Sequence, residues 1–160
     1  MMSTRSTARA NAVIASAILA TILTGCGGSS TDLDAAAVVE QLAAQGLPIT
    51  HTVTYTDATD PNKLLGRPGG YTSKAAFDDQ RVAKAAGTTE GDVGRGGSVE
   101  VFADAGEAEE RAEYISGIAK SSPLFAEYDY VKGNVVVRVS KELPPADAAA
   151  FEAALDKIVE

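Results

Sequence analysis

The most reactive side chain of the chain belongs to Cys26, its only cysteine. It stands in the stretch LTGCGGSS, directly after an apolar segment and directly before small residues. A thiolate is a soft nucleophile that can be alkylated or acylated. The small residues Thr24 and Gly25 leave the backbone beside it open to a peptidase. These surroundings favour covalent modification, and the alternative is a buried structural cysteine in an ordinary signal peptide or an N-terminal helix.

The segment before Cys26 is built like a secretory signal. Residues 1–9 carry Arg5 and Arg9 and no acidic side chain, and residues 11–23 form a mostly apolar run. A basic start, a short apolar middle and small residues at the end are the parts of such a signal. The run is shorter than the roughly 20 residues that a membrane-spanning helix needs. We therefore expect export, with removal of this segment.

The sequence Leu23-Thr24-Gly25-Cys26 resembles the lipobox of bacterial lipoproteins, an aliphatic residue followed by two small residues and a cysteine. The resemblance implies that the Cys26 sulfur carries a diacylglyceryl group and that cleavage makes Cys26 the first mature residue. It also implies the general secretory route and attachment to the outer face of the cytoplasmic membrane. The expected organisation is a signal peptide over 1–25, a lipidated flexible tether over 26–31 and one domain over 32–160.

The mature chain is acidic, and this excludes some partners. Cleavage leaves 135 residues with 12 basic and 22 acidic side chains, a formal charge of −10. Such a field opposes binding to nucleic acid or to an anionic membrane face. With Cys26 acylated no thiol remains for a disulfide, so stability must come from a core, for which a hydrophobic content of 45% is sufficient.

Familiar catalytic patterns are missing from the sequence. There is no nucleophile elbow, no Ser-x-x-Lys and no pair of His or Cys residues at zinc spacing. The one histidine, His51, alternates with threonines, and this pattern favours a hydrogen-bonded core residue. We expect a protein without enzymatic activity, cofactor or metal. The alternative is a sensor that binds a small molecule or metal ion through Asp57, Asp60, Asp78 and His51.

Residues 56–71, TDATDPNKLLGRPGGY, form the candidate binding loop. Turn-forming residues surround two adjacent leucines, which must either tuck into the core or form an exposed apolar knob. Packing of the loop on the domain and recognition from a rigid scaffold both remain open. The partner would be an envelope protein or cell-wall component. The contact residues would be Asp57, Asp60, Asn62, Leu64, Leu65, Arg67 and Tyr71.

Three segments carry a broader resemblance. DPNKLLGRPGGYTSKAAF, GGSVEVF and EYDYVKGNVVVRVS are similar to parts of small exported lipoproteins of Gram-positive bacteria, and the composition looks actinobacterial. These segments span most of residues 60–140. The resemblance implies an extracytoplasmic domain, and no functional residue can be transferred from it.

Hydrophobic periodicity predicts the elements that position these residues. Their order, α-β-β-β-α-β-β-α, favours an α+β domain in which an antiparallel or mixed sheet of four or five strands carries about three helices packed on one face. The expected elements are a helix that Thr31 caps and Gly46 stops, strands near 49–55, 71–77 and 98–102, a helix from Asp104 to about 119, a hairpin over 128–140 and a last helix that Pro144 or Pro145 opens. The acidic run of residues 107–113 is expected to be a solvated helix face.

The hairpin is the most specific of these signals. Gly133-Asn134 matches a two-residue primed turn between alternating strands. In that register Tyr130 faces Val137, and Asp129 lies opposite Arg138 as a cross-strand ion pair.

Replacing Cys26 by alanine should release the protein from the membrane. Attachment depends on acyl chains, in which each buried CH₂ contributes about 0.8 kcal/mol. The measurement is the distribution between membrane and soluble fractions after a high-salt wash, with the wild-type chain as control. A Cys26→Ala chain that stays with the membrane would contradict lipidation.

Overall fold

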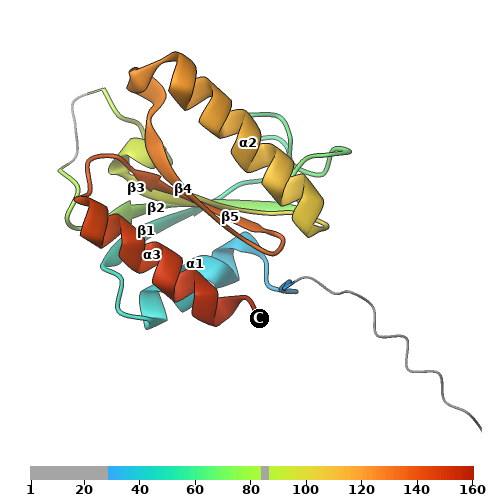
Figure 1. Ribbon diagram of the computed structural model, residues 1–160, viewed down its shortest axis with the longest axis horizontal. Coiled ribbons are helices and arrows are strands. Elements are labelled where there is room, and N and C mark those ends of the chain that lie inside the picture. Colours follow the sequence, from blue (N-terminus) through green and yellow to red (C-terminus); the bar gives the residue numbers. More distant parts are fainter. Residues whose placement is uncertain (1–28, 84–86) are drawn as a thin grey trace, which may run out of the picture.

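A five-stranded antiparallel sheet forms the middle layer of the computed structural model (Figure 1), which describes residues 29–83 and 87–160. Its strand order within these residues is β1-β2-β3-β5-β4. The strands are β1 (Ile49–Thr54), β2 (Ser73–Asp79), β3 (Gly96–Val101), β4 (Glu127–Lys132) and β5 (Val135–Ser140). The helices are α1 (Ala35–Ala44), α2 (Ala105–Ser121) and α3 (Pro145–Ile158), with short 3₁₀ turns η1 (Val93–Arg95) and η2 (Pro123–Phe125).

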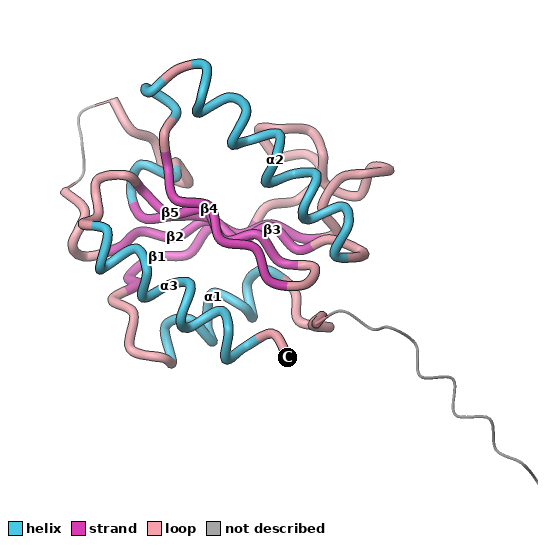
Figure 2. Tube along the Cα trace, viewed as in Figure 1, coloured by secondary structure: helices cyan, strands magenta, loops and turns pink. Residues whose placement is uncertain are grey.

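The α+β class and the predicted order of elements are confirmed, but the helices do not share one face. Figure 2 shows α1 and α3 on one side of the strands and α2 on the other. The reason lies in β5, where Val135 and Val137 pack in the core under α1 and α3 while Val136 packs in the cluster under α2. A strand buried on both faces has consecutive apolar residues and needs a cover on each side.

The main core lies between the sheet and the α1–α3 layer. The phenyl rings of Phe77 on β2 and Phe151 on α3 stack with centroids 5.3 Å apart. Both helices bury residues at helical spacing, Ala35, Val38 and Leu42 on α1 and Ala148, Phe151 and Leu155 on α3.

The first helix begins at a different cap from the predicted one. Asp34, not Thr31, caps α1, because its side chain accepts a hydrogen bond from the backbone N–H of Ala37 at 2.8 Å. Thr31 instead donates its backbone N–H to the Asn134 side chain at 2.9 Å, and Ser30 donates to the Glu160 carbonyl at 3.1 Å. The end of the expected tether is therefore part of the fold, whereas Cys26 and the signal segment lie outside the described residues.

The strand β1 corrects the prediction for His51. The register shifts between Ile49 and His51, so Ile49 packs on the main core while His51 lies opposite Asp78, on the other face of the sheet. There the His51 side chain is 48% exposed and contacts the Glu90 carboxylate, so it is not a core residue. An irregularity of one residue reverses every later side chain of a strand, and alternation alone does not reveal it.

Truncating Phe151 should show how much this core contributes. Phe151→Ala removes a fully buried ring and should lower the free energy of unfolding by about 3–5 kcal/mol. Urea unfolding measures the change, and Glu152→Ala at the neighbouring exposed position is the control. Equal effects of the two variants would contradict the packing described for α3.

Candidate functional site

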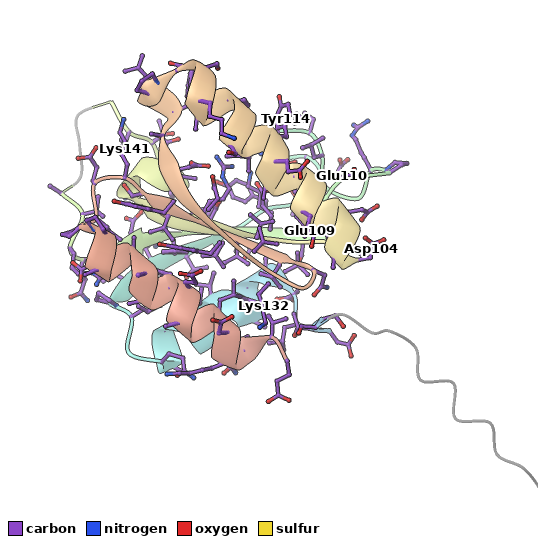
Figure 3. All side chains as sticks on the ribbon, viewed as in Figure 1. Asp104, Glu109, Glu110, Tyr114, Lys132 and Lys141 are labelled. Atoms are coloured by element: carbon purple, nitrogen blue, oxygen red, sulfur yellow. The ribbon has the colours of Figure 1, made fainter. Side chains whose placement is uncertain are left out.

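The candidate site is an open groove of about 840 Å³ beside α2, on the sheet face that this helix covers. Figure 3 labels Glu110 and Tyr114 on α2 and Lys141 beyond the end of β5, three of the residues that line it. The remaining lining comes from η1, η2, the ends of β4 and β5, and the loop before β2. The groove thus draws on segments that are far apart in the sequence.

Strand alternation places charged side chains on this face of the sheet. Val99 and Val101 of β3 point into the main core, so Ser98 and Glu100 point toward α2. On the neighbouring strands the charged residues that share this face include Lys74 and Asp78 on β2, Glu127 and Asp129 on β4, and Arg138 on β5.

Glu100 is the centre of the charged face. Its side chain is fully buried, and its carboxylate accepts from Arg111 Nε at 2.8 Å. Arg138 Nη1 lies 3.4 Å and Lys74 Nζ 3.7 Å from the same carboxylate. Burial alone would raise the pKa of Glu100, but Arg111, Arg138 and Lys74 outweigh it and hold the pKa below its ordinary value. Glu100 therefore stays ionised.

Arg138 joins Glu100 to β4. It donates to both oxygens of Glu127, from Nε at 2.7 Å and from Nη2 at 3.0 Å, a bidentate pair. The predicted register is confirmed, with Asp129 opposite Arg138. The predicted partner is not, because the guanidinium turns to Glu127 and Glu100 instead.

Asp129 is left as a poorly stabilised carboxyl beneath α2. Its Oδ1 is buried without a hydrogen-bond partner among the described residues. Burial, together with the neighbouring charge of Glu127, raises the pKa of Asp129 to about 7, against the opposing pull of Arg138. Asp129 can therefore change its charge near neutral pH.

The candidate binding loop is held by Asp60, which is fully buried. Its carboxylate accepts from the Tyr71 hydroxyl at 2.7 Å and from the backbone N–H groups of Leu64 at 2.8 Å, Leu65 at 3.1 Å and Asn62 at 3.2 Å. Burial alone would raise the pKa of Asp60, but these four donors lower it to about 2. Asp60 therefore shapes the loop from within.

Other expected contact residues of the loop also face inward. The buried Tyr71 packs edge-on against Phe102 with ring centroids 6.0 Å apart, and Leu64 and Leu65 are half-buried against the same cluster. Burial also raises the pKa of the Tyr71 hydroxyl, so it stays protonated. Packing thus accounts for the two leucines, since no exposed apolar knob forms.

The polar part of the loop meets the groove. Asp57, Asn62 and Arg67 are exposed, and Asn62 and Leu64 line the groove. With its amide oxygen turned toward its donor neighbours, Asn62 accepts from Lys74 Nζ at 2.8 Å and from Arg111 Nη2 at 3.3 Å. The loop and the charged face therefore form one polar system.

The structure brings two residues of the predicted sensor site side by side, His51 on β1 and Asp78 on β2, but among the described residues it does not gather the set into a metal site. Asp60 bonds Tyr71, Asp78 bonds Arg95, and His51 contacts Glu90. Within residues 29–83 and 87–160, no group of three or more His, Cys, Asp or Glu side chains is placed to hold a metal ion.

Sequence reasoning missed Glu100, Arg111 and Arg138 as site residues. The available signal was a charge in the middle of an apolar strand, Glu100 in SVEVF and Arg138 in VVVRVS. A charged residue at such a position is almost never buried unless it is paired. The acidic run on α2 is a solvated face as predicted, with Glu109, Glu110 and Glu113 exposed and Glu107 half-buried, and Glu107 and Glu110 also line the open groove.

Comparison with known proteins indicates no function for this chain. The sequence matches no family model, and searches of curated proteins and of solved structures return no match. Among the described residues, no helix combines the length and the hydropathy that a bilayer span requires.

The titration of Asp129 predicts how stability depends on pH. Because its folded-state pKa of about 7 lies above the ordinary value, the contribution of Asp129 to the free energy of unfolding should fall as pH rises from about 4 to about 7. Asp129→Asn removes this titration, so the variant should gain stability relative to wild type across that window. Urea unfolding at several pH values tests this, with the exposed Asp57→Asn as control. Parallel wild-type and Asp129→Asn curves would contradict the assignment.

Proposed function

We propose that the protein is a lipid-anchored, extracytoplasmic binding domain of the cell envelope that takes a small molecule into the groove beside α2, without catalysing a reaction. The groove itself carries this proposal. Its volume of about 840 Å³ is within the range of sites that hold small ligands, roughly 300–1,000 Å³. Such sites combine apolar walls with a few convergent polar groups.

The walls of the groove provide the apolar part. Ile115 and Ile118 line it from α2, while Leu124 and Phe125 line it from η2. Leu124 is 80% exposed, and Tyr114 and Phe125 are each 62% exposed. Large apolar side chains that gather at one opening mark a surface that gains from being covered.

The charged face of the sheet, with Arg111 of α2, forms the floor of the groove and provides its polar part in a fixed arrangement. Arg138 and Glu127 bind each other through two hydrogen bonds, and Arg111 is held by Glu100. Groups that the fold already holds lose little freedom when a ligand arrives. Charges that are neutralised by a permanent partner suit recognition better than proton transfer, which supports a binding role.

The lipid anchor remains part of the proposal and is supported by the sequence at Cys26. Ser30, whose backbone N–H donates to the Glu160 carbonyl, already belongs to the fold. It lies only four residues after Cys26 in the sequence. Four residues reach at most about 14 Å, so a lipid on Cys26 would keep the domain at the membrane surface. Binding would then take place at the outer face of the cytoplasmic membrane.

We propose a different role for the loop at residues 56–71 from the one expected in the sequence analysis. Asp60 and Tyr71 are buried and cannot touch a partner, whereas Asn62 and Leu64 contribute to the groove. We therefore propose the loop as one wall of a small-molecule site, in place of an independent surface for an envelope protein.

A thermal-shift screen of small molecules tests the proposal. A ligand at 100 times its dissociation constant should stabilise the protein by about 2.7 kcal/mol. Ala126→Trp, which places an indole in the groove, should abolish the shift, whereas Ala149→Trp on the exposed side of α3 should keep it. Hits that shift both variants equally would show that they bind elsewhere and would refute the groove as the site.

A further inference from the structure

We infer that the ligand of the groove is an organic cation with an apolar body, an amine whose nitrogen lies against Glu127. This inference rests on the proposed function of the groove and names the class of its ligand. It stands on the charge balance of the residues in and beneath the groove, the apolar lining and the place of Glu127.

The positive charges of the floor are already neutralised. Lys74, Arg111 and Arg138 share three buried or nearly buried carboxylates, those of Asp60, Glu100 and Glu127. Each guanidinium is held by a carboxylate at hydrogen-bonding distance. An anion would have to displace one of these partners and leave a buried carboxylate unpaired, which is strongly unfavourable. The floor therefore does not attract an anionic ligand.

The charges around this balanced floor are mainly negative. Glu107, Glu110 and Glu142 line the groove. Among the described residues that line it, Lys141 is the only lysine. The Lys141 ammonium donates to the carbonyl oxygens of Leu124 at 3.2 Å and Pro123 at 3.5 Å. The net field at the opening is negative and favours a cation.

The apolar part of the groove suits the body of such a molecule. Phe125 and Tyr114 expose aromatic rings at the opening, and aromatic faces attract cations. The Arg111 guanidinium already lies 5.7 Å from the Tyr114 ring centroid, which shows that this ring accommodates a cation. Ile115 and Ile118 provide a purely apolar surface beside it.

Glu127 is the group that can receive the amine. Glu127 and Arg138 both line the groove, so the amine would share the Glu127 carboxylate with the guanidinium that already bonds it, two residues from Asp129 on the same strand. The charged groups that act on Asp129 are Glu127 on β4, Arg138 on β5 and Glu100 on β3. A cation bound here would favour ionised Asp129, so binding near neutral pH should release a proton.

Three probes with the same phenylalkyl body and different terminal groups distinguish a cationic, a neutral and an anionic ligand: 4-phenylbutylamine, 4-phenylbutanol and 4-phenylbutyrate. Titration calorimetry uses the full chain with Cys26→Ala, which removes acyl chains that would bind the probes themselves. The amine should bind at least about tenfold more tightly than the alcohol, and the carboxylate most weakly, because the carboxylates of Glu107, Glu110 and Glu142 around the groove attract a positive charge and repel a negative one.

A matched pair of variants and one further variant locate the effect. Glu110→Lys should weaken binding of the amine about tenfold, while Glu109→Lys, next to it on α2 but outside the groove lining, should change it less than about twofold. At pH 7 the amine should release up to about half a proton, measured in two buffers of different ionisation enthalpy, and Asp129→Asn should release none.

The outcomes separate this inference from the proposed function. Equal or tighter binding of the alcohol or the carboxylate would overturn the cationic class and leave the groove as a binding site. Failure of all three probes, while the screen yields other ligands that Ala126→Trp blocks, would also overturn the inference alone. If the screen yields no such ligand either, the proposed function fails with it.

Discussion

The buried carboxylate of Glu100 is the constraint on which this side of the molecule depends. It lies fully buried in the central strand β3, where an unpaired charge would cost several kcal/mol. Arg111 from α2, Arg138 from β5 and Lys74 from β2 neutralise it together. Because these cations come from three different elements, one acidic residue determines how α2 and the neighbouring strands are joined.

The two faces of the sheet consequently hold their helices by different means. On one face α1 and α3 bury continuous apolar stripes, and the aromatic pair Phe77–Phe151 lies at the centre. On the other face α2 fully buries only Ala108 and Ile115, and Arg111 supplies a charged contact to the sheet. A helix that packs through few apolar residues leaves room beside it, which is why the groove forms along α2.

Local patterns were sufficient wherever neighbours in the sequence are neighbours in space. The turn at Gly133 determined the pairing of Tyr130 with Val137, and helix spacing determined the stripe through Phe151. The prediction that all helices share one face was wrong, although the consecutive valines of β5 carried the signal that both faces of this strand need a cover. The residues that line the groove are scattered between Asn62 and Glu142, so no single segment of the sequence predicts it. The prediction that His51 is a core residue was wrong because the register of β1 shifts between Ile49 and His51, and the alternation of residue types in the sequence does not reveal such a shift.

The loop at residues 56–71 and the charged floor act as one structural unit because of Lys74. Its ammonium lies 3.5 Å from Asp60 and 3.7 Å from Glu100, so it joins the carboxylate that shapes the loop to the one that holds α2. Burial lowers the pKa of Lys74, while Glu100 and Asp60 oppose this and favour its charged form. Asn62 covers this lysine and also accepts from Arg111. The wall that the loop gives to the groove is therefore set by the same ion pairs that set its floor, and both are in place before any ligand arrives.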